Sequence, residues 1–171
     1  MIIEEDYIIT PQFMYMIGDI NLHGTLCTEI IETSKTVIID KPPVEILNAS
    51  IQAIGFDLKG VLETSKWLLG SVHLCPIMVN PLHQLVLFPT HSPKNIESIW
   101  LNPRHVHSTS GSNELTFILF NNGKTIIAPV GISVFNKALE NAKQLEEMSV
   151  QSADRPYTFV LDPKNRYKSK N

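Results

Sequence analysis

The stretch "CPIMVNPLHQLVLFPTHS", residues 75–92, holds two short apolar runs on either side of a turn. Ile77–Val79 and Leu85–Phe88 are strand-like, and Asn80-Pro81 between them is a turn signal, because proline suits the second position of a turn. A proline also bounds the pair on each side, where it cannot donate a backbone hydrogen bond to a further strand residue. The stretch therefore predicts a buried β-hairpin and no chemistry.

A second hairpin is the clearest signal in the chain. "ELTFILFNNGKTIIAP", residues 114–129, predicts two strands around Asn122-Gly123, residues that tolerate the positive φ of a tight hairpin turn. Strands are also predicted in the first third of the chain, because apolar runs there are separated by glycines and polar residues. These strands are expected over Tyr7–Ile17, Thr25–Glu32 and Thr36–Ile39.

Three segments change to a helical period. "DKPPVEILNASIQAIG", residues 40–55, begins with helix-start residues and places its apolar residues at helical spacing. "DLKGVLETSKWLLG", residues 57–70, has Asp57 as its expected N-cap, and so short a link predicts a tight helical corner. A third, amphipathic helix is expected from about Ser133 to Ser149.

The sequence thus predicts an α+β fold of antiparallel β-hairpins with a mid-chain helical pair and an amphipathic C-terminal helix. We expect one domain over residues 1–150 and a flexible basic tail over residues 151–171. The tail contains the apolar cluster "YTFVL", which is either a last strand on the domain or a short linear motif that a partner binds in extended form.

Composition narrows the classes of protein. In 171 residues no apolar run approaches the roughly 20 residues of a membrane-spanning helix, and the acidic start is unlike a secretory signal. The two cysteines form no CxxC motif, which favours a reduced, cytoplasmic protein. The net charge of −3 is uneven, because residues 1–50 carry eight acids against two bases, whereas residues 51–130 carry five bases against four acids. A polyanion is therefore expected at the middle of the chain or at the tail.

The sequence gives only weak indications of a catalytic or metal site. His105-x-His107 would put two imidazoles on one face of a strand, but no further ligands stand at matching spacing. We therefore expect a polar surface or interface strand and no metal, and contact with an anion or DNA is the remaining alternative. Ser108–Ser112 resembles a phosphate-binding loop without the following Lys or helix start, and we expect a solvent loop. No G-x-S-x-G context appears, so we expect no enzyme, no cofactor and no small-molecule substrate.

The helical corner could in principle read DNA as a helix-turn-helix. Its second helix offers only Lys59 and Lys66 as cations, whereas helices that read bases usually present several polar or basic groups. Plain core packing is the better interpretation of the corner.

The order of these segments resembles the ComK family of competence transcription factors from Gram-positive bacteria. The specific part is "CPIMVNPLHQLVLFPTHS", then "IWLNPRHVHS", then a strand pair around "NNGKTI". "PVEILNASIQAIG" and "PVGISVFNKAL" are similar to the family around two of its helices, and the resemblance extends from about Tyr7 to Met148. The tail segment "YTFVLDP" is similar to the segment by which ComK is handed to the MecA adaptor and the ClpC-ClpP protease.

The resemblance implies a cytoplasmic, nucleoid-associated activator of DNA-uptake genes. Such a protein would bind paired A-tract and T-tract boxes as a dimer or a dimer of dimers. A-tracts narrow the minor groove and deepen its negative potential, so a few cations can be attracted there without a base-reading helix. The candidate DNA contacts are Lys59, Lys66, Lys94, Arg104, His105, His107 and Lys124. The candidate adaptor contacts are Tyr157, Phe159, Val160, Leu161 and Pro163.

One departure from the family keeps a second function open. Family members carry a basic pair after the glycine that matches Gly60, where this chain has Val61-Leu62. Because phosphate neutralisation supplies most non-specific affinity, the loss of two cations should weaken DNA binding. The alternative is a protein-interaction regulator that heterodimerises with a ComK protein or competes for the MecA-type adaptor.

Overall fold

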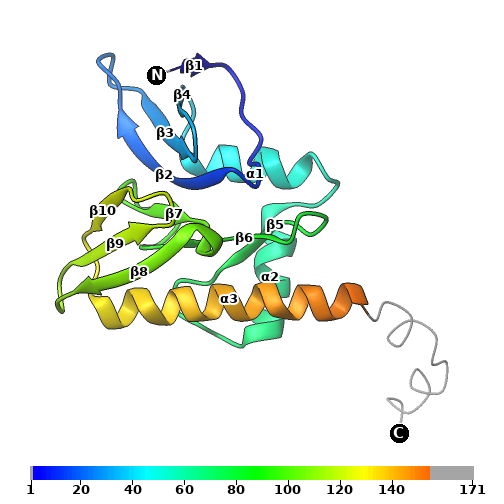
Figure 1. The fold of residues 1–171 in the computed structure, drawn as a ribbon. Coiled ribbons are helices and arrows are strands. Elements are labelled where there is room, and N and C mark those ends of the chain that lie inside the picture. The colour runs from blue at the N-terminus through cyan, green and yellow to red at the C-terminus, as the bar shows by residue number, and fades with distance from the viewer. Residues whose placement is uncertain (1, 155–171) are drawn as a thin grey trace, which may run out of the picture.

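The computed structural model describes residues 2–154, which form two β-sheets, three α-helices and one 3-10 turn (Figure 1). The larger sheet contains β1 (Ile2–Glu4), β2 (Phe13–Ile20), β3 (Leu26–Glu32), β4 (Thr36–Ile39), β5 (Ile77–Asn80), β6 (Leu85–Pro89) and β7 (Ile99–Leu101). The smaller sheet contains β8 (Val106–Gly111), β9 (Thr116–Phe120) and β10 (Thr125–Ala128). The helices are α1 (Pro43–Gln52), α2 (Leu58–Leu69) and α3 (Ile132–Asp154), and the turn is η1 (Pro103–His105).

The larger sheet has the strand order β1-β4-β3-β2-β7-β6-β5, and the smaller has the order β10-β9-β8. All neighbouring strands are antiparallel except β1 and β4, which run parallel. The hairpin expected from residues 75–92 forms as β5 and β6, and the one around Asn122-Gly123 forms as β9 and β10. The α+β class is therefore confirmed.

Strand alternation divides the core between the two faces of the larger sheet. In β6, Leu85 and Leu87 join the cluster under α1, whereas Val86 and Phe88 join the cluster under α3 and the smaller sheet. The ring of Phe88 meets Phe135 of α3 edge to face at 5.5 Å. Both faces of β6 are buried, which explains why its sequence is apolar throughout.

The helical corner forms where it was predicted. Asp57 accepts a 2.6 Å hydrogen bond from the backbone N–H of Gly60 and caps α2 at its N-terminus. The link between the helices passes through Gly55, whose φ of +89° suits glycine. The corner packs Ile46, Leu47 and Ile51 of α1 onto the larger sheet.

Four expectations need correction. The strand predicted over Tyr7–Ile17 begins only at Phe13, because Pro11 lies in a turn closed by a hydrogen bond from the Phe13 N–H to the Thr10 carbonyl. The solvent loop predicted over Ser108–Ser112 is strand as far as Gly111, because the apolar strand β9 offers its backbone to that polar segment.

The other two corrections concern the histidines and the tail. His105 lies in the turn η1 and His107 in β8, so the two do not share one face of a single strand. Helix α3 continues to Asp154, so residues 151–154, which were expected in the tail, are helical. The rest of the predicted tail lies outside the described residues. Within the described range, no helix is long and apolar enough to cross a membrane.

Candidate nucleic-acid interface

Helix α2 presents two of the predicted cations together. Lys59 and Lys66 are seven residues apart, so they point from the same side of the helix, and both are exposed. They border a shallow hollow between α1 and α2 that also contains Glu45 and Glu63. The local charge is thus mixed, and the two ammonium groups are the part of this surface that could meet a phosphate backbone.

Four of the predicted lysines are free of acidic partners. Within residues 2–154, Lys59, Lys66, Lys94 and Lys124 form no ion pair, whereas Lys35, Lys41 and Lys137 each do. Lys94 lies in the loop between β6 and β7, and Lys124 lies in the turn between β9 and β10. The structure therefore does not gather the cations on one element, because three separate segments supply them.

Arg104 is held by the protein itself. Its Nε donates to Oε1 of Glu146 on α3 at 3.0 Å, and its other guanidinium nitrogens donate to the His83 carbonyl at 3.3 Å and to the Gln84 side chain at 3.4 Å. The side chain is still 37% exposed. A phosphate that approached Arg104 would thus meet a cation whose charge is already partly neutralised.

The two histidines differ in their surroundings. The ring Nε2 of His105 lies 2.9 Å from the Pro11 carbonyl, which ties η1 to the segment before β2. His107 is exposed on β8. No group of three His, Cys, Asp or Glu side chains within the described residues could hold a metal ion.

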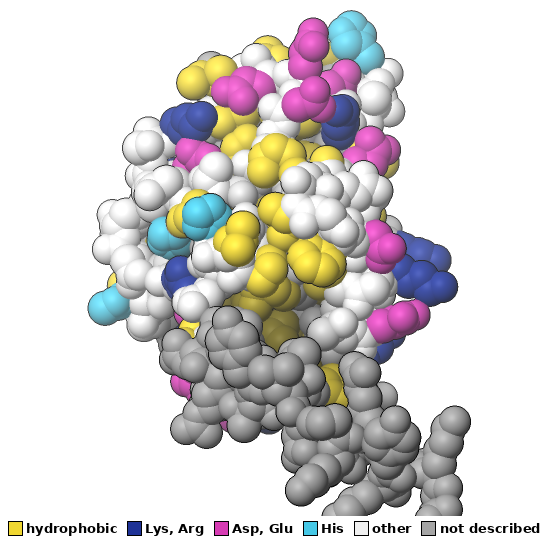
Figure 2. Space-filling view, turned by 90° about the vertical axis from the view of Figure 1, so that its right-hand side faces the viewer, with side chains coloured by type: hydrophobic (Ala, Val, Ile, Leu, Met, Phe, Trp, Pro, Cys, Tyr) yellow, Lys and Arg dark blue, Asp and Glu magenta, His cyan; other side chains and the backbone are white. Residues whose placement is uncertain are grey.

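Acidic side chains dominate the other end of the molecule. Figure 2 shows Asp and Glu side chains gathered over the upper part, which β1–β4 form in Figure 1. This distribution follows from the excess of acids in residues 1–50. Nucleic acid would be repelled from this end, so the segments that carry the free lysines are the remaining electrostatic candidates.

The outer face of the smaller sheet is apolar, which sequence reasoning missed. Phe117 of β9 and Ile127 of β10 are Cα partners across the strands, and they are 47% and 56% exposed. Leu115 beside them is 40% exposed. The available signal was the unbroken apolar run "FILF", because a strand with one solvated face normally alternates apolar and polar residues. We call Leu115, Phe117 and Ile127 the outer apolar face.

The candidate adaptor contacts, Tyr157, Phe159, Val160, Leu161 and Pro163, lie outside the described residues. Among the cysteines, Cys27 is buried and Cys75 is half-buried, and both are free thiols. Burial raises the pKa of both thiols, so neither has the thiolate character of a reactive cysteine.

The chain matches known proteins over most of its length. The family model of the ComK protein matches residues 4–154, which is nearly the whole described fold. The chain is also similar to the competence transcription factor of Bacillus subtilis (strain 168), with 29% identity over 148 residues, which cover 84% of this chain and 77% of that protein. No solved structure matches the chain.

Proposed function

Because this chain belongs to the ComK family, we propose that it activates competence genes by binding AT-rich duplex DNA as an oligomer, without chemistry of its own. The family match over residues 4–154 is the observation that carries the proposal. It applies to the folded body as a whole, including both sheets and all three helices.

The free lysines give the proposal a physical basis. Minor-groove binding to A-tracts needs few cations, since the narrow groove concentrates negative potential. Lys59, Lys66, Lys94 and Lys124 can each neutralise a phosphate without breaking an ion pair of the described residues. His107, which is exposed on β8, is a further predicted contact.

Arg104 and His105 remain predicted contacts of lower weight. Arg104 would bind DNA while it is held by Glu146, and His105 would do so while it contacts the Pro11 carbonyl. Both interactions occupy nitrogen atoms that would otherwise be free to bind a phosphate. We therefore expect the lysines of α2 to contribute more than Arg104.

For the oligomer, the outer apolar face is the surface that we propose. Phe117 and Ile127 form an exposed apolar pair across two strands. Burying this pair under a second copy would remove apolar surface from water, and this stabilises the oligomer. Two copies joined at this face would present two sets of lysines to paired DNA boxes.

The test is a titration of the protein against a duplex with paired A-tract and T-tract boxes and against a GC-rich duplex of the same length, each at two salt concentrations. We expect tighter binding to the AT-rich duplex and a loss of affinity at the higher salt, because cations that bind phosphate release counterions. Equal binding to both duplexes, or none to either, would contradict the proposal.

The second candidate function is the protein-interaction regulator, and the outer apolar face is the observation that favours it. In that case the face would bind a ComK protein, and Tyr157–Pro163 would bind a MecA-type adaptor. A pull-down with the adaptor, using chains with and without residues 155–171, tests the second part. Unchanged capture after the deletion would show that the tail is not the adaptor-binding segment.

A further inference from the structure

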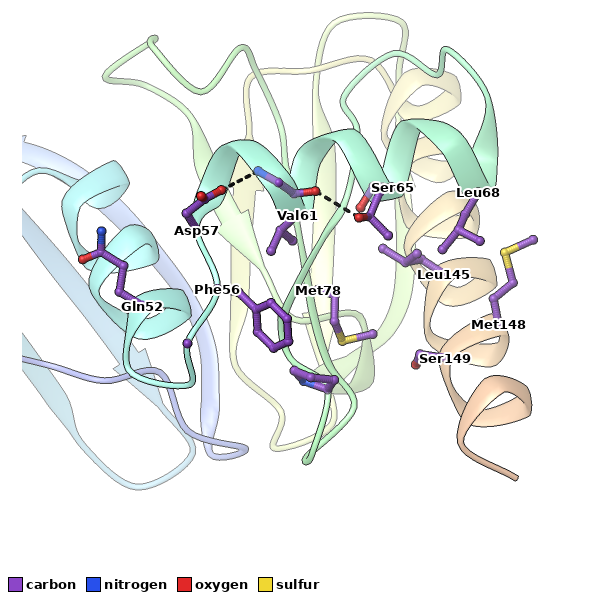
Figure 3. A pocket seen from close by; sticks show the side chains of 14 residues that line it. Gln52, Phe56, Asp57, Val61, Ser65, Leu68, Met78, Leu145, Met148 and Ser149 are labelled. Atoms are coloured by element: carbon purple, nitrogen blue, oxygen red, sulfur yellow. Dashed lines mark hydrogen bonds between the residues drawn. The ribbon is translucent and has the colours of Figure 1, made fainter. Parts of the chain in front are cut away.

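An apolar groove lies between α2, the α1–α2 link, the β5–β6 turn and α3. It encloses about 720 Å³. Figure 3 shows Phe56 of the link, Val61 of α2 and Met78 of β5 pointing into the same hollow, with Leu145 and Met148 of α3 on its far side. In Figure 2 the yellow side chains at the centre of the view mark an apolar surface on this side of the molecule.

The groove leaves apolar side chains exposed to solvent. Phe56 is 55% exposed although other apolar side chains line the hollow on both sides of it. Exposed apolar patches on soluble proteins commonly mark a place where another segment binds. Asp57 is the one charged side chain among the described residues that line the groove. The groove therefore suits an apolar segment with basic neighbours.

The groove and the two lysines of α2 lie on opposite faces of that helix. At 100° per residue, Val61 and Leu68 point about 160° away from Lys59 and Lys66. A segment in the groove would thus leave the lysine face of α2 uncovered. A segment bound in the groove would therefore not compete with DNA for the lysines of α2.

We propose that this groove binds the chain's own segment Tyr157–Leu161. The sequence "YTFVL" places Tyr157, Phe159 and Leu161 on one side of an extended chain, since side chains alternate along a strand. That side matches a hollow lined by Phe56, Met78 and their apolar neighbours.

The length of chain beyond the described residues permits this return. The groove contacts α3 as far as Ser149, and α3 is described to Asp154, which is about 7.5 Å further along its axis at 1.5 Å per residue. The five residues from Asp154 to Phe159 span up to about 17 Å when extended. An extended chain can therefore turn back along α3 and bring Phe159 level with the groove.

Charge favours the same docking. Residues 1–154 carry 9 Lys and Arg against 16 Asp and Glu, whereas residues 155–171 carry 5 against 1. The acidic body therefore attracts the basic segment, and the bases that flank "YTFVL" can approach Asp57 at the edge of the groove. When it is bound, the segment is withheld from any other protein that would capture it in extended form.

Chymotrypsin digestion of the full chain tests the proposal. The enzyme cleaves after aromatic and large apolar side chains, so it cuts a free tail after Tyr157, Phe159, Leu161 and Tyr167. Tyr167 lies outside the docked segment and is an internal control. Relative to a synthetic peptide of residues 155–171, we expect cleavage after Phe159 to be at least tenfold slower in the full chain, with cleavage after Tyr167 little changed.

Three variants, one of them a control, locate the protection. Phe56→Asp should restore cleavage after Phe159 to the peptide rate, whereas Leu22→Asp, which introduces the same charge at a fully exposed side chain between β2 and β3, should not. Phe159→Ser should release Leu161 to cleavage in the same way, and it changes no residue of the described range 2–154. Circular dichroism confirms that each variant is folded.

Three outcomes would overturn the proposal. One is a Phe159 cleavage rate in the full chain equal to that in the peptide. The second is protection that persists in folded Phe56→Asp, which would place the segment elsewhere. The third is protection that disappears on dilution, which would make a second copy of the chain the occupant of the groove.

Discussion

The guanidinium Nε of Arg104 lies 3.0 Å from the Glu146 carboxylate, and this ion pair connects the turn η1 to helix α3. Arg104 was expected from the sequence to contact DNA, and the structure shows that it also has a role within the protein. The predicted DNA contact and the observed ion pair can be tested separately by changing one member of the pair at a time.

We predict opposite effects on DNA binding from the two partners. Arg104→Ala should weaken binding to the AT-rich duplex and flatten its salt dependence, whereas Glu146→Gln should strengthen binding because it frees the guanidinium. Fluorescence anisotropy at several salt concentrations measures both. An unchanged salt slope in Arg104→Ala would remove Arg104 from the contacts. Either variant also breaks the partly exposed Arg104–Glu146 ion pair. We therefore expect each to lower the free energy of unfolding by about 0.2–1 kcal/mol.

The lysines of α2 should have the larger effect. In the double variant Lys59→Gln, Lys66→Gln, the slope of log affinity against log salt should fall in magnitude by roughly 1.8, since each phosphate contact contributes about 0.9. Lys137→Gln is the matched control, because that lysine is paired with Glu140 on α3. A double variant with the same slope as the Lys137 control would show that α2 does not bind the duplex.

A buried tyrosine makes the fold sensitive to alkaline pH. The hydroxyl of Tyr7 donates a 2.6 Å hydrogen bond to the Glu32 carboxylate, and both side chains are buried. Burial, together with the Glu32 carboxylate, raises the pKa of Tyr7 far above its usual value. The unfolded chain, in contrast, loses this phenol proton near pH 10.

This difference sets the direction of the pH dependence. The folded state retains the proton, so the stabilisation is complete below pH 10 and is lost as the pH rises further, by up to about 1.4 kcal/mol per unit. At pH 7, Tyr7→Phe should cost about 1–3 kcal/mol, because Glu32 loses its nearest donor. Urea unfolding from pH 7 to pH 11 should show the two proteins converging above pH 10. A constant difference across this range would contradict the prediction.

The outer apolar face should control self-association. Phe117→Asp introduces a charge beside Ile127, so we expect the variant to sediment as a smaller species than the unaltered chain. Leu22→Asp is the control, because Leu22 is fully exposed in the hairpin between β2 and β3. Equal sedimentation of all three proteins would exclude this face as the oligomer interface.

Local signals were sufficient for most elements of the fold. The prolines around residues 76–89 and the Asn122-Gly123 turn act over a few residues, and both hairpins form where they predict. The Asp57 cap of α2 is equally local. The signal failed where a distant strand determined the outcome: residues 108–111 have no apolar pattern and become a strand because β9 pairs with them.

The candidate sites were less predictable than the fold. Residue types identified the cations, but the sequence could not show that Arg104 lies against Glu146, 42 residues further along the chain. Nor could it show that Phe56, Met78 and Leu145 line one groove, because three elements distant in sequence supply them. These relationships depend on how the helices pack against the sheet, and no local pattern contains that information.

The sequence by itself determined the α+β class, the hairpins, the helical corner and the resemblance to the ComK family, because each of these depends on neighbouring residues or on their order. Only the tertiary structure decided which cations are free and which apolar side chains remain exposed. A charge is neutralised, or a side chain covered, only when folding brings remote segments within a few ångströms. The availability of Lys59 and the confinement of Arg104 are both consequences of that packing.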